Sequence, residues 1–525
     1  MISQPKMGWE VSFSKKVCFV TRPNARLTLS EHMKDVKKKA ENRLKIVKKL
    51  ASTTWGADKN TLRQLYIGYV RSSMDYSLSL QTISSESTQE TVDKVQNQAL
   101  RFISGAMKST ATATCEVHTN VAPMNLRREA AVINDVERYK RLDNKNQNKI
   151  LTESERPIQR LKKNSILSVA EKLKPKYLMP EEREPVYLFD VNDYPSKIFE
   201  KPKVFLDLKE ALTKKNTDET SLMLAASSVI NDYPDEWIHI YTDGSATKGT
   251  TNAGYGSRIG FPDGSYTELF DSCGSFCSNY DAEAEAILKS LDFILSQFEF
   301  DLKEKNNIVI FTDAKSVLQS LEGSSSSDAK IKDIIYIADK LITSYNVDVT
   351  LQWIPGHVGI PGNECADKLA KRGAQCAQTN TCASMNTVKH LINENMKNAW
   401  MKQWSEEKNG RKVFKFMPEP NKKDPVNQLE RKDQVIIFRL RSEHIQLNQH
   451  LNMIRVRNNA NCPLCPCTEE SVAHHLYDCP ALGDLRAEYL PLNPDPQNTL
   501  YGEGEQLKLT CKYHVMANGR RAQAH

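Results

Sequence analysis

Apolar residues recur at helical spacing along the first quarter of the chain. One helix is expected at 30–51, with Ser30 as a candidate N-cap. Its apolar residues lie three or four positions apart: Met33, Val36, Ala40, Leu44 and Val47. The same spacing predicts further helices at 59–80, 88–104 and 124–143. We interpret residues 1–150 as an all-helical domain.

Regular patterning is lost after this domain. Six prolines are spread between Pro157 and Pro202, together with acidic clusters. Because prolines at such spacing stop helices and strands from growing, we interpret residues 151–235 as a proline-rich linker with short docked pieces.

A period of two begins at Trp237. Ile238 and Ile240 face one side of an expected strand that ends at Asp243. Further strands are expected at 253–261, 265–272, 308–312 and 347–354. Helices are expected at 281–297, 314–321, 328–344 and 362–375. The order βββαβααβα implies a mixed sheet with helices packed on it, and we assign this α/β domain to residues 236–376.

The composition is that of a protein without a membrane segment. A chain of 525 residues is too long for one core and should contain roughly two to four domains. No apolar run approaches the ~18 residues that a membrane span needs. The first residues lack the hydrophobic core of a signal peptide. We therefore expect an intracellular protein, cytoplasmic or nuclear, whose twelve cysteines are reduced.

The net charge of +7 hides an asymmetry between segments. Residues 1–150 carry 26 Lys and Arg against 14 Asp and Glu, a net of +12. Residues 236–376 carry 12 against 20, a net of −8. Basic flanks would hold a nucleic acid while the acidic segment collects cations. The alternative is that charge drifts between domains only for solubility.

Four carboxylates of the acidic segment are candidates for one site. Asp243 and Asp313 both follow expected strands, at the edge where mixed α/β sheets place ligands. Glu283 is favoured over Glu285, which shares the solvent face of the helix with Lys289. The helical neighbours of Glu283 are apolar and face the sheet: Ala286, Ile287, Leu291 and Ile294. The fourth carboxylate, Asp367, lies one turn after Asn363 and beside Ala366 and Ala370.

Carboxylates that converge repel one another unless a cation lies among them. Hard ions such as Mg²⁺ or Mn²⁺ prefer oxygen ligands, and two such ions can activate water and stabilise the leaving oxygen of a phosphodiester. The alternative is that each aspartate merely forms a turn at the end of its strand.

Four blocks of this segment, in this order, resemble type 1 ribonuclease H: Tyr-Thr-Asp-Gly-Ser at 241–245, Ala-Glu-Ala-Glu-Ala-Ile at 282–287, Phe-Thr-Asp-Ala-Lys-Ser at 311–316 and Gln-Trp-Ile-Pro-Gly-His-Val-Gly-Ile-Pro-Gly-Asn-Glu-Cys-Ala-Asp-Lys-Leu-Ala at 352–370. The resemblance implies a ribonuclease H-like fold, two Mg²⁺ or Mn²⁺ ions, and cleavage of the RNA strand of RNA–DNA hybrids.

The same resemblance assigns roles to single residues. Its metal-binding, catalytic set is matched by Asp243, Glu283, Asp313 and Asp367. His357 matches a loop histidine that assists product release or proton transfer. Asn279 matches a substrate contact, and Asn363 supports the last carboxylate near the substrate. The basic helix and loop that some members use to grip the hybrid is replaced by the short Gly323–Asp328 connection, so we expect the grip to come from elsewhere.

The last segment, 377–525, is expected to be helical with a small zinc module. Its donors follow the spacing Cys462-x2-Cys465-x8-His474-x4-Cys479, which suits a tetrahedral Zn²⁺ site. Cys467 and His475 are spare donors, so the choice of ligands stays open. Neighbouring arginines would suit nucleic-acid contact: Arg439, Arg441, Arg455 and Arg457. The polar end of the chain is expected to fray.

The N-terminal domain also resembles a known family. Leu50-Ala-Ser-Thr-Thr-Trp-Gly and Tyr69-Val-Arg-Ser-Ser-Met-Asp-Tyr are similar to the region after the palm in reverse transcriptases of jockey-like non-LTR retrotransposons. In those elements ribonuclease H and a Cys-Cys-His-Cys segment follow. Because no Tyr-x-Asp-Asp motif is present, we expect a C-terminal part of such a polyprotein that lacks the polymerase palm. Two alternatives are a catalytically inactive, nucleic-acid-binding remnant and a structural, partner-binding protein.

Overall fold

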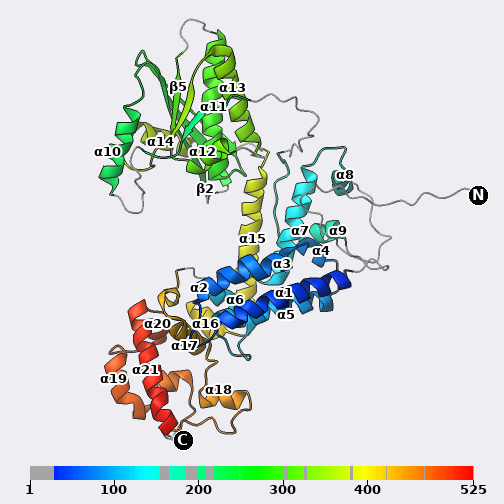
Figure 1. Cartoon of the computed structure of the whole chain (residues 1–525), viewed down its shortest axis with the longest axis vertical. Coiled ribbons are helices and arrows are strands. Elements are labelled where there is room, and N and C mark those ends of the chain that lie inside the picture. Colours follow the sequence, from blue (N-terminus) through cyan, green and yellow to red (C-terminus); the bar gives the residue numbers. More distant parts are fainter. Residues whose placement is uncertain are drawn as a thin grey trace, which may run out of the picture. The chain divides into compact units, whose positions relative to one another are not determined.

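The computed structural model of the chain (Figure 1) describes residues 29–153, 165–184, 199–208, 218–247, 249, 251–300, 306–323, 328–378, 382–420, 423–465 and 468–523. These residues form two compact units. One comprises the described residues of Met1–Val132, Arg160–Val169 and Met396–His525. The other comprises those of Ile133–Gln159 and Ala170–Asn395. The segments expected to be separate first and last domains therefore belong largely to one unit.

The second unit is built on a six-stranded sheet of order β1-β6-β5-β2-β3-β4. Its strands are β1 (Lys203–Phe205), β2 (Ile238–Thr247), β3 (Thr251–Gly260), β4 (Tyr266–Gly274), β5 (Ile308–Thr312) and β6 (Val349–Trp353). β1, β6, β5 and β2 run parallel, whereas β3 and β4 pair antiparallel to their neighbours. The expected mixed sheet is confirmed.

Helices cover both faces of this sheet, as Figure 1 shows. The helices that lie wholly within this unit are α8 (Gln147–Glu153), α10 (Glu219–Ile230), α11 (Asn279–Phe300), α12 (Lys315–Glu322), α13 (Ala329–Tyr345) and α14 (Pro361–Gln375). Alternation along β5 separates the faces: Ile308 and Ile310 lie in a core with α11, α12 and α13, whereas Val309 and Phe311 lie in a core with α10. The order βββαβααβα from β2 to α14 is confirmed.

The stretch expected to be a linker contributes to the sheet. β1 pairs in parallel with β6, and α10 buries Leu222, Ala226 and Val229 against the sheet. β1 and α10 are therefore docked pieces within the expected linker, although the sequence did not indicate where they lie. A three-residue strand shows no periodicity in the sequence, and its pairing exists only because the open edge of β6 is available.

The first unit begins with the helices α1 (Ser30–Leu50), α2 (Lys59–Leu65), α3 (Ser72–Asp75), α4 (Leu78–Gln81), α5 (Glu86–Ser104) and α6 (Thr112–Thr119). Leu29, not Ser30, occupies the N-cap position of α1, and no side chain caps this helix. The expected helix at 59–80 is interrupted by a π-helical turn, η1 (Tyr66–Arg71), and by Ser77 in a left-handed conformation.

The C-terminal part of the same unit packs on these helices. It contains α16 (Arg411–Phe416), η2 (Pro425–Gln428), α17 (Arg431–Ser442), α18 (Asn448–Met453), η3 (His474–Asp478), η4 (Pro480–Leu482), α19 (Gly483–Tyr489), α20 (Pro496–Leu500) and α21 (Gly504–Gln523). Arg431 donates hydrogen bonds to the carbonyl oxygens of Ile103 at 2.5 Å and Phe102 at 2.7 Å. Phe438 lies in the core of the N-terminal helices.

Three helices contribute residues to both units: α7 (Met124–Lys140), α9 (Ile166–Leu173) and α15 (Met385–Glu406). As far as Gln523, the last described residue, the C-terminal segment is not frayed as expected, because α21 buries Cys511, Tyr513 and Ala517. Within the described part of the chain, no helix combines the length and apolarity that crossing a membrane requires.

Candidate active site

Asp243 and Asp313 stand at one edge of the sheet. The parallel pairing of β2 and β5 aligns Thr242 with Thr312, so the residue after each threonine emerges at the same place. Glu283 reaches this point from α11. One ligand atom from each of Asp243, Glu283 and Asp313 lies within 4.8 Å of the others. The structure thus brings together three of the four carboxylates expected to form a site.

A close contact between β2 and α11 delivers Glu283 to the site. A Cβ atom on Gly244 would collide with the backbone nitrogen of Glu283, so glycine lets the helix lie directly on the strand. Glu283 Oε2 is buried and has no hydrogen-bond partner among the described residues. An orphaned carboxylate oxygen in this position is a ready cation ligand.

Glu285 differs from its expected surroundings. The helical pattern predicts a solvent-facing Glu285, yet its side chain is only 17% exposed and pairs with Lys330 of α13 as well as with Lys289. Helical phasing separated the two glutamates correctly, but the sequence did not reveal that α13 covers the second one.

The carboxylates destabilise one another's charged forms. Burial, and then the charges of Asp313 and Asp367, raise the pKa of Asp243 to about 7. Hydrogen bonds with the Glu283 side chain and with Gly244 N, which donates to Asp243 Oδ1 at 2.7 Å, act in the opposite direction. Burial, and then Asp243 and Asp313, hold the pKa of Glu283 well above its usual range. A divalent cation would relieve this repulsion, and the all-oxygen donor set fits Mg²⁺ or Mn²⁺.

Asp367 lies outside the close group. Helix α14 packs tightly on β3, since a Cβ atom on Gly256 would collide with Ala366 O and Ala370 N. Asp367 is near enough for its charge to raise the pKa of Asp243. However, Asp367 Oδ2 accepts a hydrogen bond of 2.6 Å from Lys371 Nζ, one turn along the helix. The fourth expected ligand is therefore held by a neighbouring cation.

The remaining candidates differ in their access to solvent. His357 is exposed, with φ +60°, in the loop before α14. The next residue back, Gly356, packs on the side chain of Asp313 and brings this loop to the site. Asn279 is exposed at the start of α11. Asn363 is 1% exposed and its Oδ1 has no partner among the described residues, so it is not placed to touch a substrate directly and occupies a supporting position.

Comparison with known proteins agrees with this geometry. Residues 235–375 match the family described as RNase H. Ribonuclease H of Neisseria gonorrhoeae is 30% identical over 159 residues, which are 27% of this chain and 97% of that protein. The chain belongs to the ribonuclease H family. Ribonuclease H of Stutzerimonas stutzeri is 28% identical over 151 residues, 26% of this chain and 92% of the relative.

Other relatives match less completely. Ribonuclease H of Saccharomyces cerevisiae is 31% identical over 193 residues, 32% of this chain, and the chain spans about half, 53%, of its length. Among solved structures, RNase H1 from Halobacterium salinarum is 24% identical over 26% of this chain and 97% of that chain, with a TM-score of 0.21. The strand order and the family match, and not this score, define the ribonuclease H fold here. They support ribonuclease H activity for about a quarter of the chain.

The ribonuclease H domain is tied to residues beyond the family match. Asp281, two residues before Glu283, is buried, and its Oδ2 accepts hydrogen bonds from Ser278 Oγ at 2.8 Å, Ser384 Oγ at 2.8 Å and Thr387 Oγ1 at 2.5 Å. Ser384 also caps α15 by accepting from Thr387 N at 3.1 Å. The sequence contains this capping signal, but only the fold shows that the cap closes on α11. The domain boundary expected at 376 therefore excludes partners of α11.

A second cluster of metal-ligand types lies in the other unit. Cys462, Cys465, His474 and Cys479 are buried, with one ligand atom each within 4.8 Å of the others. Cys465 Sγ lies 3.2 Å from His474 Nε2 and 3.6 Å from Cys479 Sγ. Burial, and then the neighbouring thiols, raise the pKa of Cys465 to about 12. Three thiols and one imidazole are a donor set that fits Zn²⁺.

The two spare donors, Cys467 and His475, are not among the four residues of this cluster. His475 Nε2 lies 3.0 Å from His514 Nδ1, so His475 is engaged elsewhere, and Cys467 lies outside the described residues. His474 is oriented by Thr468 Oγ1, 3.0 Å from its Nδ1, which leaves Nε2 facing the thiols.

Two of the arginines expected to contact nucleic acid are structural. Arg441 is 3% exposed and forms an ion pair of 2.7 Å with the buried Asp424. Arg439 donates to the carbonyl oxygen of Gly105 at 2.9 Å. Arg455 and Arg457 remain exposed. The sequence did not distinguish the two pairs because burial of an arginine depends on a distant carboxylate or carbonyl.

Proposed function

We propose that the chain is a metal-dependent endonuclease that hydrolyses the RNA strand of RNA–DNA hybrids. The observation that carries this proposal is the convergence of Asp243, Glu283 and Asp313 at one edge of a ribonuclease H sheet. The proposal is supported further by relatives that bear the name ribonuclease H.

The residues of the site would divide the work as follows. Asp243, Glu283 and Asp313 would hold two Mg²⁺ or Mn²⁺ ions through carboxylate oxygens, and Asp367 would join them on leaving Lys371. Such ions activate a water and stabilise the leaving oxygen of a phosphodiester. Asn279, exposed at the start of α11, orients the hybrid. His357, on the exposed loop that touches Asp313 through Gly356, carries a proton at the leaving oxygen or assists product release.

We further propose that the chain derives from a non-LTR retrotransposon polyprotein and that Zn²⁺ occupies the Cys462, Cys465, His474 and Cys479 cluster. The support is the order of segments: basic helices, ribonuclease H, then a Cys/His cluster. Reading the genomic DNA upstream of the Met1 codon for a Tyr-x-Asp-Asp motif tests the first statement. Mass spectrometry of the purified, folded full chain tests the second, since metal-free folded protein would refute it.

The decisive experiment compares the full chain with its Asp243→Asn variant on a labelled RNA–DNA hybrid in the presence of Mg²⁺. We expect cleavage of the RNA strand by the parent and none by the variant. Asp292→Asn is the matched control, because Asp292 is exposed on the same α11 helix that carries Glu283, and it should cleave as the parent does.

Two results would defeat this proposal. If the parent fails to cleave while binding the hybrid, the chain is a catalytically inactive, nucleic-acid-binding remnant. If Asp243→Asn cleaves as fast as the parent, the activity arises from another site or from a contaminant.

A further inference from the structure

The tripeptide Asn-Gly-Arg occurs twice in the chain, at 409–411 and at 518–520. An asparagine before a glycine can cyclise with the backbone, because a glycine without a side chain leaves its amide nitrogen open to approach. Two identical tripeptides have the same intrinsic chemistry, so a difference in their reactivity has to come from the fold.

The copy at 518–520 is held inside a helix. Asn518 and Gly519 lie in α21, where the amide nitrogen of Gly519 belongs to the helical hydrogen-bond ladder. The side chain of Asn518 is fixed at both ends, because its Nδ2 donates to His514 Nε2 at 2.8 Å and its Oδ1 accepts from Arg521 Nη1 at 2.7 Å. The backbone nitrogen and the side-chain amide are therefore kept from approaching each other.

The copy at 409–411 lies in the turn between α15 and α16. Asn409 is exposed, and its side-chain Nδ2 makes only a long contact of 3.4 Å with Glu407 Oε1 among the described residues. Gly410 N donates no hydrogen bond to any other residue that the structure describes. Both groups that a cyclisation needs are available here.

The fold itself requires the glycine of this turn. Gly410 has φ +75°, in the left-handed region, at the N-cap position of α16. A Cβ atom on Gly410 would collide with Thr114 Oγ1 of α6 and crowd the ring of Trp404. The close contact between these helices therefore keeps a glycine directly after Asn409.

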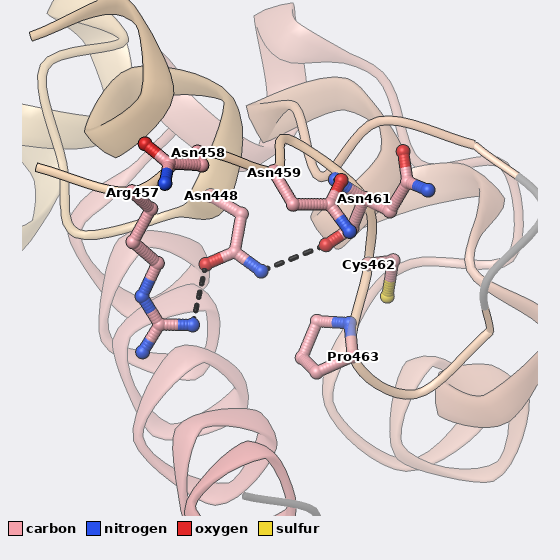
Figure 2. Close-up of a pocket in the computed structure, with 7 residues that line it drawn as sticks. All are labelled: Asn448, Arg457, Asn458, Asn459, Asn461, Cys462 and Pro463. Atoms are coloured by element: carbon pink, nitrogen blue, oxygen red, sulfur yellow. Dashed lines mark hydrogen bonds between the residues drawn. The ribbon is translucent and has the colours of Figure 1, made fainter. Parts of the chain in front are cut away.

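Exposed asparagines without a following glycine offer an internal comparison. Figure 2 shows three of them around a polar pocket in the same unit: Asn458, Asn459 and Asn461. They are followed by asparagine, alanine and cysteine, and these residues carry side chains that hinder approach to their amide nitrogens. Asn409 combines the exposure of these asparagines with the glycine of the helical copy.

We propose that Asn409 is a site of spontaneous deamidation that loosens the turn between α15 and α16. Gly410 N gives up its proton and attacks Cγ of Asn409, which closes a succinimide ring, and Nδ2 leaves as ammonia. Water then opens the ring at either carbonyl carbon to give aspartate or isoaspartate. Asparagine amides are among the thermolabile groups of proteins, and water is the co-reactant.

The product enters a tightly anchored corner. Arg411 donates to the carbonyl oxygens of Trp404 at 3.1 Å and Ser405 at 3.0 Å, and so closes the end of α15. Trp404 is 1% exposed. Isoaspartate lengthens the backbone by a methylene group and adds a carboxylate between Arg411 and these acceptors, so it pulls Gly410 away from Thr114.

The test follows the full chain during prolonged incubation in heavy-oxygen water at neutral pH. Peptide mass spectrometry, with chromatographic separation of aspartate and isoaspartate, measures conversion at each asparagine. We expect Asn409 to convert at least about tenfold faster than Asn518, because the helix has to open before the second copy can react. The three asparagines of Figure 2 should also lag behind Asn409. The rate at Asn409 should rise with pH, since Gly410 N has to lose a proton.

The same chain in denaturant is the control for the role of the fold. Unfolding should bring Asn409 and Asn518 to similar rates, because the two tripeptides are identical. Similar rates at both positions in the folded chain would overturn the proposal. So would a folded chain in which Asn409 stays unconverted while the denatured chain reacts at this position.

Hydrogen exchange over residues 404–417 tests the structural consequence. The aged parent should exchange faster in this segment than the fresh parent. Aged Asn409→Gln should not, because the longer side chain disfavours ring closure. Asn518→Gln is the matched control and should age as the parent does. A parent that has converted at Asn409 but exchanges like the fresh protein would refute the loosening of the turn.

Discussion

The two clusters of ligand-type side chains are built in opposite ways. Asp243, Glu283 and Asp313 come from three elements that are far apart in the sequence, and the buried core beneath them is largely aliphatic. Cys462, Cys465, His474 and Cys479 come from one short segment, and the three cysteines are themselves members of the hydrophobic core of their unit. In the first case the fold assembles the site, and in the second the site is part of what holds the fold.

This difference implies opposite consequences of metal removal. The carboxylates repel one another without a cation, yet the sheet and its helices bury them regardless, so the ribonuclease H core should survive. The thiols are part of the hydrophobic core in a segment with little regular structure, so loss of a metal that they hold should loosen the segment itself. The following predictions test that contrast in order of decreasing effect.

The largest effect is expected from Cys465→Ser. Loss of one ligand should release the metal and destabilise the segment around Cys462–Cys479 by several kcal/mol, because structural Zn²⁺ supplies folding free energy. Metal content by mass spectrometry and hydrogen exchange of this segment measure the effect. Cys511→Ser is the control, since Cys511 is buried in the same core but outside the cluster. Equal effects of the two substitutions would show that the cluster is ordinary core.

The second-largest effect is expected from Glu283→Gln, which should lower activity without lowering stability. Glu283→Gln keeps the shape of a carboxylate ligand but removes its charge, and it should lower hybrid cleavage by about 10³-fold, since metal ligation supplies several kcal/mol to the transition state. Its thermal stability without metal should not fall. A variant that unfolds would break the contrast, because it would make the carboxylates structural.

A stability change of the opposite sign is expected from Asp243→Asn. The pKa of Asp243 is about 7 in the folded chain, above its ordinary value of 3.8, chiefly because of burial. The folded state therefore binds the proton first as pH falls. Metal-free stability should rise as pH falls from about 7 to about 4 and should be constant for this group below that range. At pH 8 the variant should gain about 2–4 kcal/mol.

Denaturant titration of the metal-free parent and variant at several pH values tests this expectation. The gain should be small near pH 4 and disappear at about pH 3, where Asp243 is protonated in both states. Saturating Mg²⁺ should reverse the order at pH 8, because only the parent keeps the full ligand set. A parent more stable than the variant at pH 8 without metal would contradict the repulsion described above.

A smaller effect should show that the carboxylate site depends on chain outside the family match. Thr387→Val removes one of the three hydroxyl donors to the buried Asp281 and should destabilise the sheet unit by about 1–3 kcal/mol. Thr387→Ser should restore most of this loss. Thermal melting compares the variants, and no loss in Thr387→Val would mean that the contact with α15 does not support α11.

The smallest effect concerns Lys371. Its side chain is 58% exposed, and its ammonium group forms an ion pair with Asp367. Lys371→Met should free this carboxylate and lower the Mg²⁺ concentration for half-maximal cleavage about two- to fivefold, as suits a largely exposed ion pair. Lys368→Met, an exposed neighbour on α14, controls for the loss of one positive charge. An equal shift in both variants would indicate general electrostatics and not competition for Asp367.

The local pattern of apolar and polar residues predicted much of the secondary structure of the ribonuclease H domain. Alternation in β2 and the apolar run of β5 identified two neighbouring strands, and the helical phase of Glu283 distinguished it from Glu285. The phase could not show that Lys330 covers Glu285, nor that Lys371 would hold Asp367 in preference to the other carboxylates. Those outcomes depend on which charges meet after the helices have packed.

The pattern of apolar residues did not predict the elements that form only because they pair with or pack on another part of the fold. β1 has three residues and needs the edge of β6, and α10 needs the face formed by Val309 and Phe311. Arg441 looked like any surface arginine, but it is buried because Asp424 and the carbonyl oxygen of Leu500 meet its guanidinium. The sequence shows that Arg441 can donate hydrogen bonds, but it does not show which acceptors lie near the guanidinium group after folding.

The sequence by itself determined the order of strands and helices, the identity of the carboxylates and the local spacing of the Cys/His donors, because these follow from side-chain periodicity and short-range geometry. Only the tertiary structure decided which carboxylates converge, which spare donors are excluded, and that chain from both ends forms one unit. The physical reason is that burial, pairing and repulsion act between groups that the chain brings together from distant positions.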